Sequence, residues 1–231
     1  MRHLSIIVPV LNEAGCIVGH LSALQSLRAR GSEVIVVDGG SDDGTAALAT
    51  PLATPLADRV LTSARGRAAQ MNAGAASANG EILLFLHADC ALPADADRLI
   101  FEALAGAAAG WGRFDIAIDG RHPLLPLIAW SMNRRSRLTG IATGDQAMFV
   151  RRDWFVAAGG FPGIALMEDI ALSGALRRRG SPCCLDARVR ASGRRWERQG
   201  AIRTMLVMWW LRFRFFLGAR ADRLAMRYER R

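Results

Sequence analysis

The sequence predicts an α/β protein in which a mostly parallel sheet is flanked by helices and followed by a C-terminal helical extension. Strand-like runs alternate with helical stretches along the first half of the chain, a pattern that gives parallel strands joined by right-handed crossovers. Residues 82–86 are five apolar residues in succession, as expected for a strand buried on both faces of a sheet. The polar residues His87 and Asp89 follow at once, and ligands of open α/β sheets bind beside such carboxyl strand ends.

The other elements follow from local patterns. Residues 4–8 form the first expected strand, which Pro9 should end because proline has no N–H to donate. Apolar residues spaced three or four apart between positions 17 and 27 predict a helix, and a second strand is expected at 33–37. Further predictions are helices at 46–49, 65–74, 94–105 and 167–179, strands at 60–61, 111–118, 147–150 and 183–189, and a long helical stretch at 198–231.

Composition narrows the class of protein. With 51% hydrophobic and 22% charged residues the chain is globular rather than disordered. Its net charge of +9 suits phosphate groups, a nucleic acid or an anionic membrane surface. The absence of helix-turn-helix, zinc-finger and RNA-binding aromatic patterns argues against nucleic acid. Four cysteines without C-x-x-C spacing predict reduced thiols, and an N-terminus unlike a signal peptide predicts a cytoplasmic location.

The chain is expected to form one domain over residues 1–197 with an extension over 198–231, because no linker-like break is found. The apolar part of the extension, 204–218, makes roughly 22 Å of helix, against about 30 Å of hydrocarbon in a bilayer. Arg212 and Arg214 lie inside it, each costing about 2.5–3.5 kcal/mol at a membrane centre. The extension should therefore lie on the inner face of the membrane or pack on the domain. A third alternative is that it contacts a second subunit in a homodimer.

Three acidic positions carry the expected chemistry. Asp38 and Asp89 follow predicted strands, and Asp169 stands near a predicted helix start. A sugar nucleotide needs an acceptor for the N–H of its base, a divalent cation on its pyrophosphate, and a base for the attacking hydroxyl. Hard oxygen ligands of this kind suit Mg²⁺ or Mn²⁺. The structural alternatives are that Asp89 caps a turn and that Glu168 and Asp169 only place negative charge at a helix N-terminus.

Several motifs follow one another in a characteristic order: SIIVPVLNE at 5–13, VVDGGSDDGT at 36–45, Asn72-x-Gly74, FLHAD at 85–89, and MED at 167–169 with Arg195-Trp196 behind it. In this order they resemble the family 2 glycosyltransferases, which have the GT-A (Rossmann-like) fold. The spellings RGRAAQMNAG and FLHADC further resemble a bacterial subgroup associated with radical-SAM/selenodomain clusters and arsenosugar biosynthesis.

The resemblance implies a pocket for a nucleotide-diphosphate sugar. His87-Ala88-Asp89 stands where the family has Asp-x-Asp, so Asp89 should hold the metal, with His87 either a second ligand or a residue behind it. Because a neutral imidazole is a poor Mg²⁺ ligand, His87 favours Mn²⁺ over Mg²⁺. The residues implied to line the nucleotide pocket are Pro9, Asn12, Glu13, Asp38, Arg67, Asn72, His87 and Ala88.

The same resemblance implies an inverting, single-displacement transfer in which Asp169, next to Glu168, is the catalytic base. Gly144, Asp145, Gln146, Arg195 and Trp196 are implied to lie on the acceptor side. Ser192 replaces the Gln of the Q-x-x-R-W motif of processive synthases, so a polymerase is not expected. The acceptor is either a small molecule or a polyprenyl phosphate. The alternative function is a non-catalytic nucleotide-sugar-binding or membrane-surface scaffold of the same fold.

Overall fold

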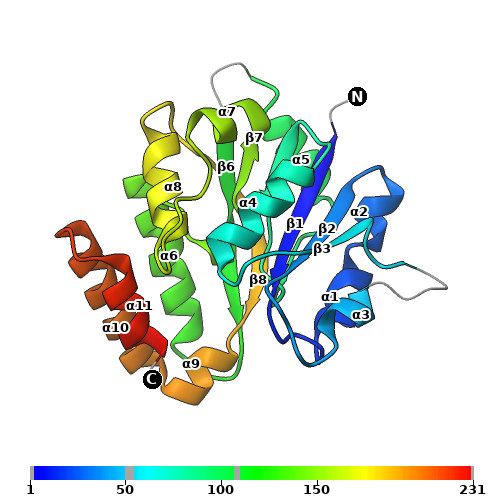
Figure 1. The fold of residues 1–231 in the computed structure, drawn as a ribbon. Helices are drawn as coiled ribbons and strands as arrows, with labels where there is room; N and C mark the ends of the chain where they lie inside the picture. The colour runs from blue at the N-terminus through cyan, green and yellow to red at the C-terminus, as the bar shows by residue number, and fades with distance from the viewer. Residues whose placement is uncertain (1–2, 50–54, 107–109, 230–231) are drawn as a thin grey trace.

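The computed structural model describes residues 3–49, 55–106 and 110–229. Over these residues one sheet of eight strands has the order β3-β2-β1-β4-β7-β6-β8-β5 (Figure 1). The strands are β1 (Leu4–Val10), β2 (Glu33–Asp38), β3 (Arg59–Thr62), β4 (Ile82–Phe85), β5 (Cys90–Ala91), β6 (Trp111–Asp119), β7 (Phe149–Arg151) and β8 (Cys183–Ser192). The helices are α1 (Ile17–Ala23), α2 (Gln25–Ala29), α3 (Thr45–Ala49), α4 (Arg67–Ser77), α5 (Ala96–Ala103), α6 (Leu125–Thr139), α7 (Arg152–Ala157), α8 (Glu168–Arg177), α9 (Arg194–Gln199), α10 (Ala201–Phe216) and α11 (Ala221–Glu229), with a 3₁₀ turn η1 (Gly144–Gln146).

The first four strands in the sheet, β3, β2, β1 and β4, are all parallel, as the alternating pattern predicts. β7 runs antiparallel to both of its neighbours, β4 and β6, while β6 pairs with β8 in parallel. The sheet is therefore mixed, with its parallel half built from the N-terminal part of the chain. The carboxyl ends of β1, β2 and β4 lie together at one edge, where the predicted site residues follow them.

The prediction that Pro9 ends the first strand is wrong. β1 continues to Val10, and Pro9 is paired with Val37 of β2. The Ile7 carbonyl bonds Leu86 beyond β4, whereas the Val10 carbonyl bonds Gly39 beyond β2, so alternate residues of β1 face opposite neighbours. Proline therefore lacks its N–H on the β4 side, where the pairing has already ended, and the ladder to β2 is unaffected.

Helices cover both faces of the sheet with apolar side chains. Alternate β1 residues point to opposite cores, with Ile6 in one and Ile7 in the other. The first core is closed by α1, α2, α5 and α6, and the second by α4, α7 and α8. The helix expected over 17–27 is in fact two short helices, because the chain makes a tight turn at Leu24, whose N–H bonds the Leu21 carbonyl.

The C-terminal stretch is not one continuous helix. Gly200, at a φ of 83°, separates α9 from α10, and a second break separates α10 from α11. Both α10 and α11 pack against the start of α8 through a small apolar cluster that includes Leu211, Leu224 and Ile170. Figure 1 shows this helical pair beside α6 and α8, far from α1–α3. Within the described residues no helix has the length and apolar character to cross a membrane.

Candidate active site

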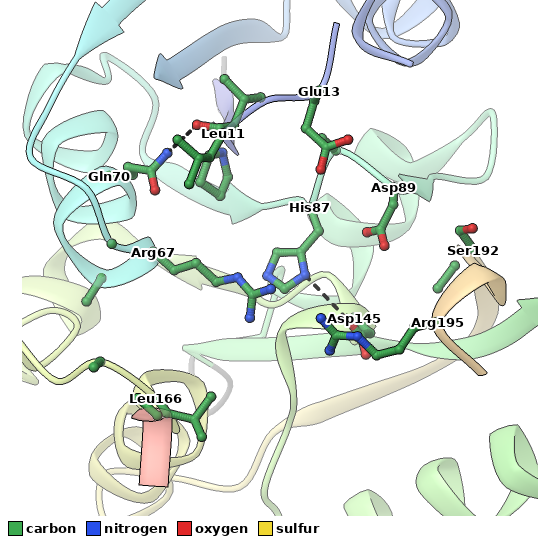
Figure 2. Close-up of a pocket in the computed structure, with 18 of the residues that line it drawn as sticks. Leu11, Glu13, Arg67, Gln70, His87, Asp89, Asp145, Leu166, Ser192 and Arg195 are labelled. Atoms are coloured by element: carbon green, nitrogen blue, oxygen red, sulfur yellow. Dashed lines mark hydrogen bonds and ion pairs between the residues drawn. The ribbon is translucent and has the colours of Figure 1, made fainter. Parts of the chain in front are cut away.

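A cleft of about 1280 Å³ opens at the carboxyl ends of β1 and β4. Its walls come from the loop after β1, the first turn of α4, the segment after β4, η1, the loop before α8, and the helices α9 and α11. Figure 2 shows charged side chains from several of these elements meeting in it. The predicted site residues that line the cleft are Pro9, Glu13, Arg67, His87, Ala88, Asp89, Asp145, Arg195 and Trp196.

The remaining predicted site residues do not line the cleft, and those after β1 and β2 hold loops in shape. Asp38 is 4% exposed, and its carboxylate accepts the backbone N–H groups of Gly40 and Ser41 and the Ser41 hydroxyl. The Asn12 Oδ1 accepts the N–H of Asp42, at 3.1 Å. These two side chains therefore fix the loops that follow β1 and β2.

Two amides of α4 fasten this helix to its surroundings. The Gln70 Nε2 donates to the carbonyls of Val10 and Val37, at 2.7 and 2.8 Å, and so ties together the ends of β1 and β2. The Asn72 side chain bonds the backbone N–H and carbonyl of Phe161, which links α4 to the loop before α8. Gln70 lines the cleft but was not among the predicted site residues. The one signal for it in the sequence is its position one helical turn after Arg67.

His87 and Asp145 form a pair across the cleft. The His87 Nδ1 lies 3.3 Å from the Asp145 Oδ1, and the dashed line in Figure 2 marks this contact. Partial burial alone would raise the pKa of Asp145, but the His87 hydrogen bond and the charges of Arg67 and Arg195 lower it to about 2. Gly144 leaves room for the pair, because a Cβ at this position would lie 2.4 Å from the His87 Cε1.

Asp89 directs an exposed carboxylate into the cleft (Figure 2). Among the described residues it has no arginine or lysine within ion-pair distance, and no cluster of three or more acidic, His or Cys ligands is found. The described residues thus offer carboxylates that stand apart in the cleft rather than a closed cage, and that of Asp89 is exposed. Such a site fits Mg²⁺ or Mn²⁺ bound through one or two carboxylates together with the phosphates of a substrate.

Asp169 lies in the first turn of α8, behind η1. Its Oδ2 accepts the N–H of Gly144 at 2.8 Å, and its Oδ1 accepts the N–H of Ile170. Glu168 beside it is 5% exposed, and burial together with the Asp169 charge raises its pKa. Gln146 is buried and caps η1 through Thr143. Asp169 therefore reaches the cleft wall through one hydrogen bond.

Comparison with known proteins agrees with this architecture. The sequence pattern described as Glycosyl transferase family 2 matches residues 5–155. The chain belongs to this family. A glycosyltransferase, AglE, of Haloferax volcanii is 40% identical over 91 residues, which are 37% of this chain and 30% of AglE.

Solved structures share the GT-A fold of this family 2 member. A mannosyltransferase of Pyrobaculum calidifontis in complex with GDP-Man and Mn²⁺ has a TM-score of 0.64 and 24% identity, covering 82% of this chain and 56% of that one. TarS 1-349 of S. aureus in complex with UDP has a TM-score of 0.67 and 19% identity, covering 83% and 60%. This chain thus spans less than two thirds of the length of these relatives.

Strained backbone in this family 2 member clusters around the predicted site. The non-glycine residues with left-handed φ among the described residues are Asn12, Ala147 and Met167. Asn12 follows β1, Ala147 directly follows η1, and Met167 directly precedes Glu168. Because Ala147 is left-handed, the strand predicted at 147–150 begins only at Phe149. Such conformations cost about 1–3 kcal/mol each and are typical of functional sites.

Two partly buried arginines near Asp169 were not among the predicted site residues. Arg135 comes from α6 and Arg212 from α10. Burial and the charge of Arg212 lower the pKa of Arg135 to about 10, against the opposing effect of Asp169. Arg135 stands in a basic segment of the sequence, but nothing local indicates that a residue of the distant α10 lies near it.

Proposed function

We propose that this family 2 member transfers a sugar, with inversion, from a nucleotide-diphosphate donor to an acceptor. The observation that carries the proposal is the exposed carboxylate of Asp89 at a strand end, inside a cleft that Arg67 and Arg195 also line. Two arginines facing one carboxylate suit a diphosphate bound together with a divalent cation. The GDP-Man and Mn²⁺ complex of the P. calidifontis mannosyltransferase and the UDP complex of TarS support this interpretation.

In this mechanism Asp89 would hold Mn²⁺ or Mg²⁺, which when bound neutralises charge on the donor diphosphate. Arg67 and Arg195 bind the diphosphate oxygens and stabilise the negative charge that develops there as the bond to the sugar breaks. His87 and Gly144 hold Asp145 at the centre of the cleft. Because the His87 Nδ1 contacts Asp145, the role we propose for His87 is to orient Asp145 beside the metal ligand.

Asp169 is the proposed base. The acceptor oxygen forms the new bond to the anomeric carbon on the face opposite the departing diphosphate, and its proton passes to the Asp169 carboxylate. The backbone N–H groups of Gly144 and Ile170 orient that carboxylate and leave lone pairs for the proton. The buried Glu168 beside it supports the turn. The placement in the radical-SAM/selenodomain-associated subgroup stays a prediction, because the comparisons match the family as a whole.

The test is a substitution at Asp89. Release of nucleoside diphosphate from a panel of UDP- and GDP-sugars, with Mn²⁺ or Mg²⁺, should fall by about 10²–10³ in Asp89→Asn. Asp95→Asn is the matched control, since Asp95 lies six residues after Asp89, just before α5. Its one ion pair within the described residues is with Arg98. An Asp89→Asn protein as active as the parent would overturn the proposal.

A second substitution separates the acceptor classes. A neutral hydroxyl needs a base, whereas a phosphate oxygen that attacks directly is already ionised. Asp169→Asn should therefore abolish transfer to an alcohol while leaving nucleotide binding intact. Full retention of transfer would assign a polyprenyl phosphate as the nucleophile and remove the base role from Asp169.

We further propose that α10 rests on an anionic membrane surface at the cytoplasmic side. Its inner face packs on α8, yet its outer face carries an apolar stripe, each member more than half exposed, formed by Ile202, Leu206, Trp209, Phe213 and Phe216. Arg214 and Arg227 lie over the ring of Trp210, which places cations at the border of the stripe. Aromatic residues flanked by arginine are typical of helices that lie in the headgroup region.

Vesicle flotation tests this contact. The parent should bind vesicles with anionic lipid more strongly than neutral vesicles, and Leu206→Glu with Phe213→Glu should remove the binding. Val156→Glu is the control, because Val156 is equally exposed but lies on α7. A protein that floats with neither kind of vesicle and doubles its mass in light scattering would instead assign the stripe to a homodimer.

A non-catalytic scaffold is the second candidate, favoured by His87 in place of the first acid of the family motif. It predicts nucleotide binding without release of product from any donor and acceptor tested.

A further inference from the structure

Two arginines near Asp169 have no partners for part of their guanidinium groups. The buried side-chain nitrogens without a hydrogen-bond partner in the described chain include Nε and Nη2 of Arg135 and Nε of Arg212. Buried polar groups are almost always hydrogen-bonded, so each exception needs a reason, such as a ligand that is missing from the structure. These atoms therefore indicate an incomplete site.

The charges around this position do not cancel. Arg135 and Arg212 repel each other, and Asp169 attracts both of them without forming an ion pair with either. The Asp169 oxygens are engaged by backbone N–H groups of Gly144 and Ile170. Two partly buried cations thus share the charge of Asp169, with the charge of Asp145 acting on Arg212 as well, and part of each guanidinium group stays unpaired.

The position of the pair in the fold indicates what it serves. Leu211, next to Arg212, is 1% exposed and packs in the cluster that joins α10 to the start of α8. The C-terminal helices therefore carry Arg212 to the proposed base, while α11 supplies Asp222 and Ala225 to the cleft wall. Neither arginine lines the cleft itself, but both stand close enough to Asp169 for its charge to act on them.

We propose that Arg135 and Arg212 form a subsite for a phosphate group of the acceptor. Guanidinium groups present N–H donors in a planar fork that matches the oxygens of a phosphate, and a doubly charged anion would satisfy the open donors of both residues. The inference rests on the proposed transfer reaction and names its acceptor class. The phosphate can belong to a prenyl phosphate lipid or to a small soluble metabolite.

Inorganic phosphate is the first probe. With UDP or GDP and Mg²⁺ occupying the donor site, phosphate at ten times its dissociation constant should raise the melting temperature of the parent by about 3–6 °C. Arg135→Gln with Arg212→Gln should lose this shift. Arg134→Gln with Arg203→Gln, which removes two exposed arginines from the same helices, should keep it. The same shift in the parent and the first variant, or none in the parent, would overturn the subsite.

A ligand-free melt distinguishes a binding role from a structural one. Because the two guanidinium groups repel each other and some of their nitrogens lack partners, Arg135→Gln with Arg212→Gln should melt at or above the parent temperature without phosphate. A melting temperature several degrees lower would show that the arginines stabilise the fold itself, and would contradict the proposal.

Acceptor pairs then identify the source of the phosphate. Geranyl phosphate in vesicles is compared with geraniol, and glycerol 3-phosphate with glycerol. The parent should prefer the phosphorylated member of one pair by at least about tenfold, and the arginine variant should lose that preference. Equal use of the neutral alcohols would overturn the inference. Nucleotide binding and donor hydrolysis, measured alone, report on the proposed function separately, since only Asp89→Asn should abolish them.

Discussion

The two ends of the cleft differ in how completely their polar groups are paired. At the ends of β1 and β2, the side chains of Asn12, Asp38 and Gln70 bond backbone groups of the loops and strands. At the Asp169 end, Arg135 and Arg212 retain open donors, and the helix that supplies Arg212 exposes an apolar stripe to solvent. The loops of the first end are already finished by bonds within the protein, whereas we propose that a bound ligand completes the second, open end.

This difference assigns separate tasks to the two ends. A nucleotide of constant shape can be received by loops that are already fixed, because preformed loops need no ordering when the ligand binds. An acceptor with a negatively charged phosphate can instead pair with the open guanidinium groups of Arg135 and Arg212. Removal of polar groups should therefore destabilise the fold at the first end and not at the second.

The largest expected effect on stability is at Gln70. Gln70→Met removes one hydrogen bond from each of the buried carbonyls of Val10 and Val37, while the pairing of β1 with β2 is kept. Urea unfolding should show a loss of about 1–3 kcal/mol. Gln199→Met, at an exposed position of the same cleft, should change the free energy of unfolding by less than about 0.5 kcal/mol. Equal effects of the two changes would contradict the comparison.

A comparable or smaller effect on stability is expected at the His87–Asp145 pair, which lies between the two ends of the cleft. Gly144→Ala places a methyl group against the His87 ring and forces apart the His87–Asp145 pair, at a cost of about 1–3 kcal/mol. Gly163→Ala lies in the same cleft with nothing within 4 Å of the added carbon, so it should leave the melting temperature unchanged. Thermal melts compare the two. A Gly144→Ala protein as stable as the Gly163→Ala control would show that His87 moves freely.

The sequence predicts the finished end far better than the open one. The parallel half of the sheet follows from alternating strands and helices, and Asp89 is found because it directly follows a buried strand. The mostly parallel sheet flanked by helices is confirmed. The antiparallel direction of β7 is not predicted, because a short apolar strand carries no signal of its direction.

Pairings between distant residues are also missed. The contact of His87 with Asp145 joins elements that no local pattern relates, and the approach of Arg212 to Arg135 depends on how α10 packs on α8. Each of these residues can be read from the sequence, but only the packing of apolar faces decides which side chains meet. Local periodicity predicts which elements form, whereas tertiary packing determines which charges stay unpaired.

The smallest expected effect is a pH dependence at the open end. Burial and the neighbouring Asp169 raise the pKa of Glu168 in the folded protein, so the folded state holds its proton to higher pH than the unfolded chain does. Stability from this group is therefore present below the ordinary glutamate pKa and is lost as pH rises through the raised one. Glu168→Gln removes the dependence without a large change in shape. Measured by urea unfolding, its stability relative to the parent should increase from pH 4 to pH 7, by about 1.4 kcal/mol for each tenfold difference in proton affinity between the folded and unfolded states. A difference between the two proteins that stays constant over this range would show that Glu168 is ionised without penalty, and the Asp169 end would then be as well compensated as the end at β1 and β2.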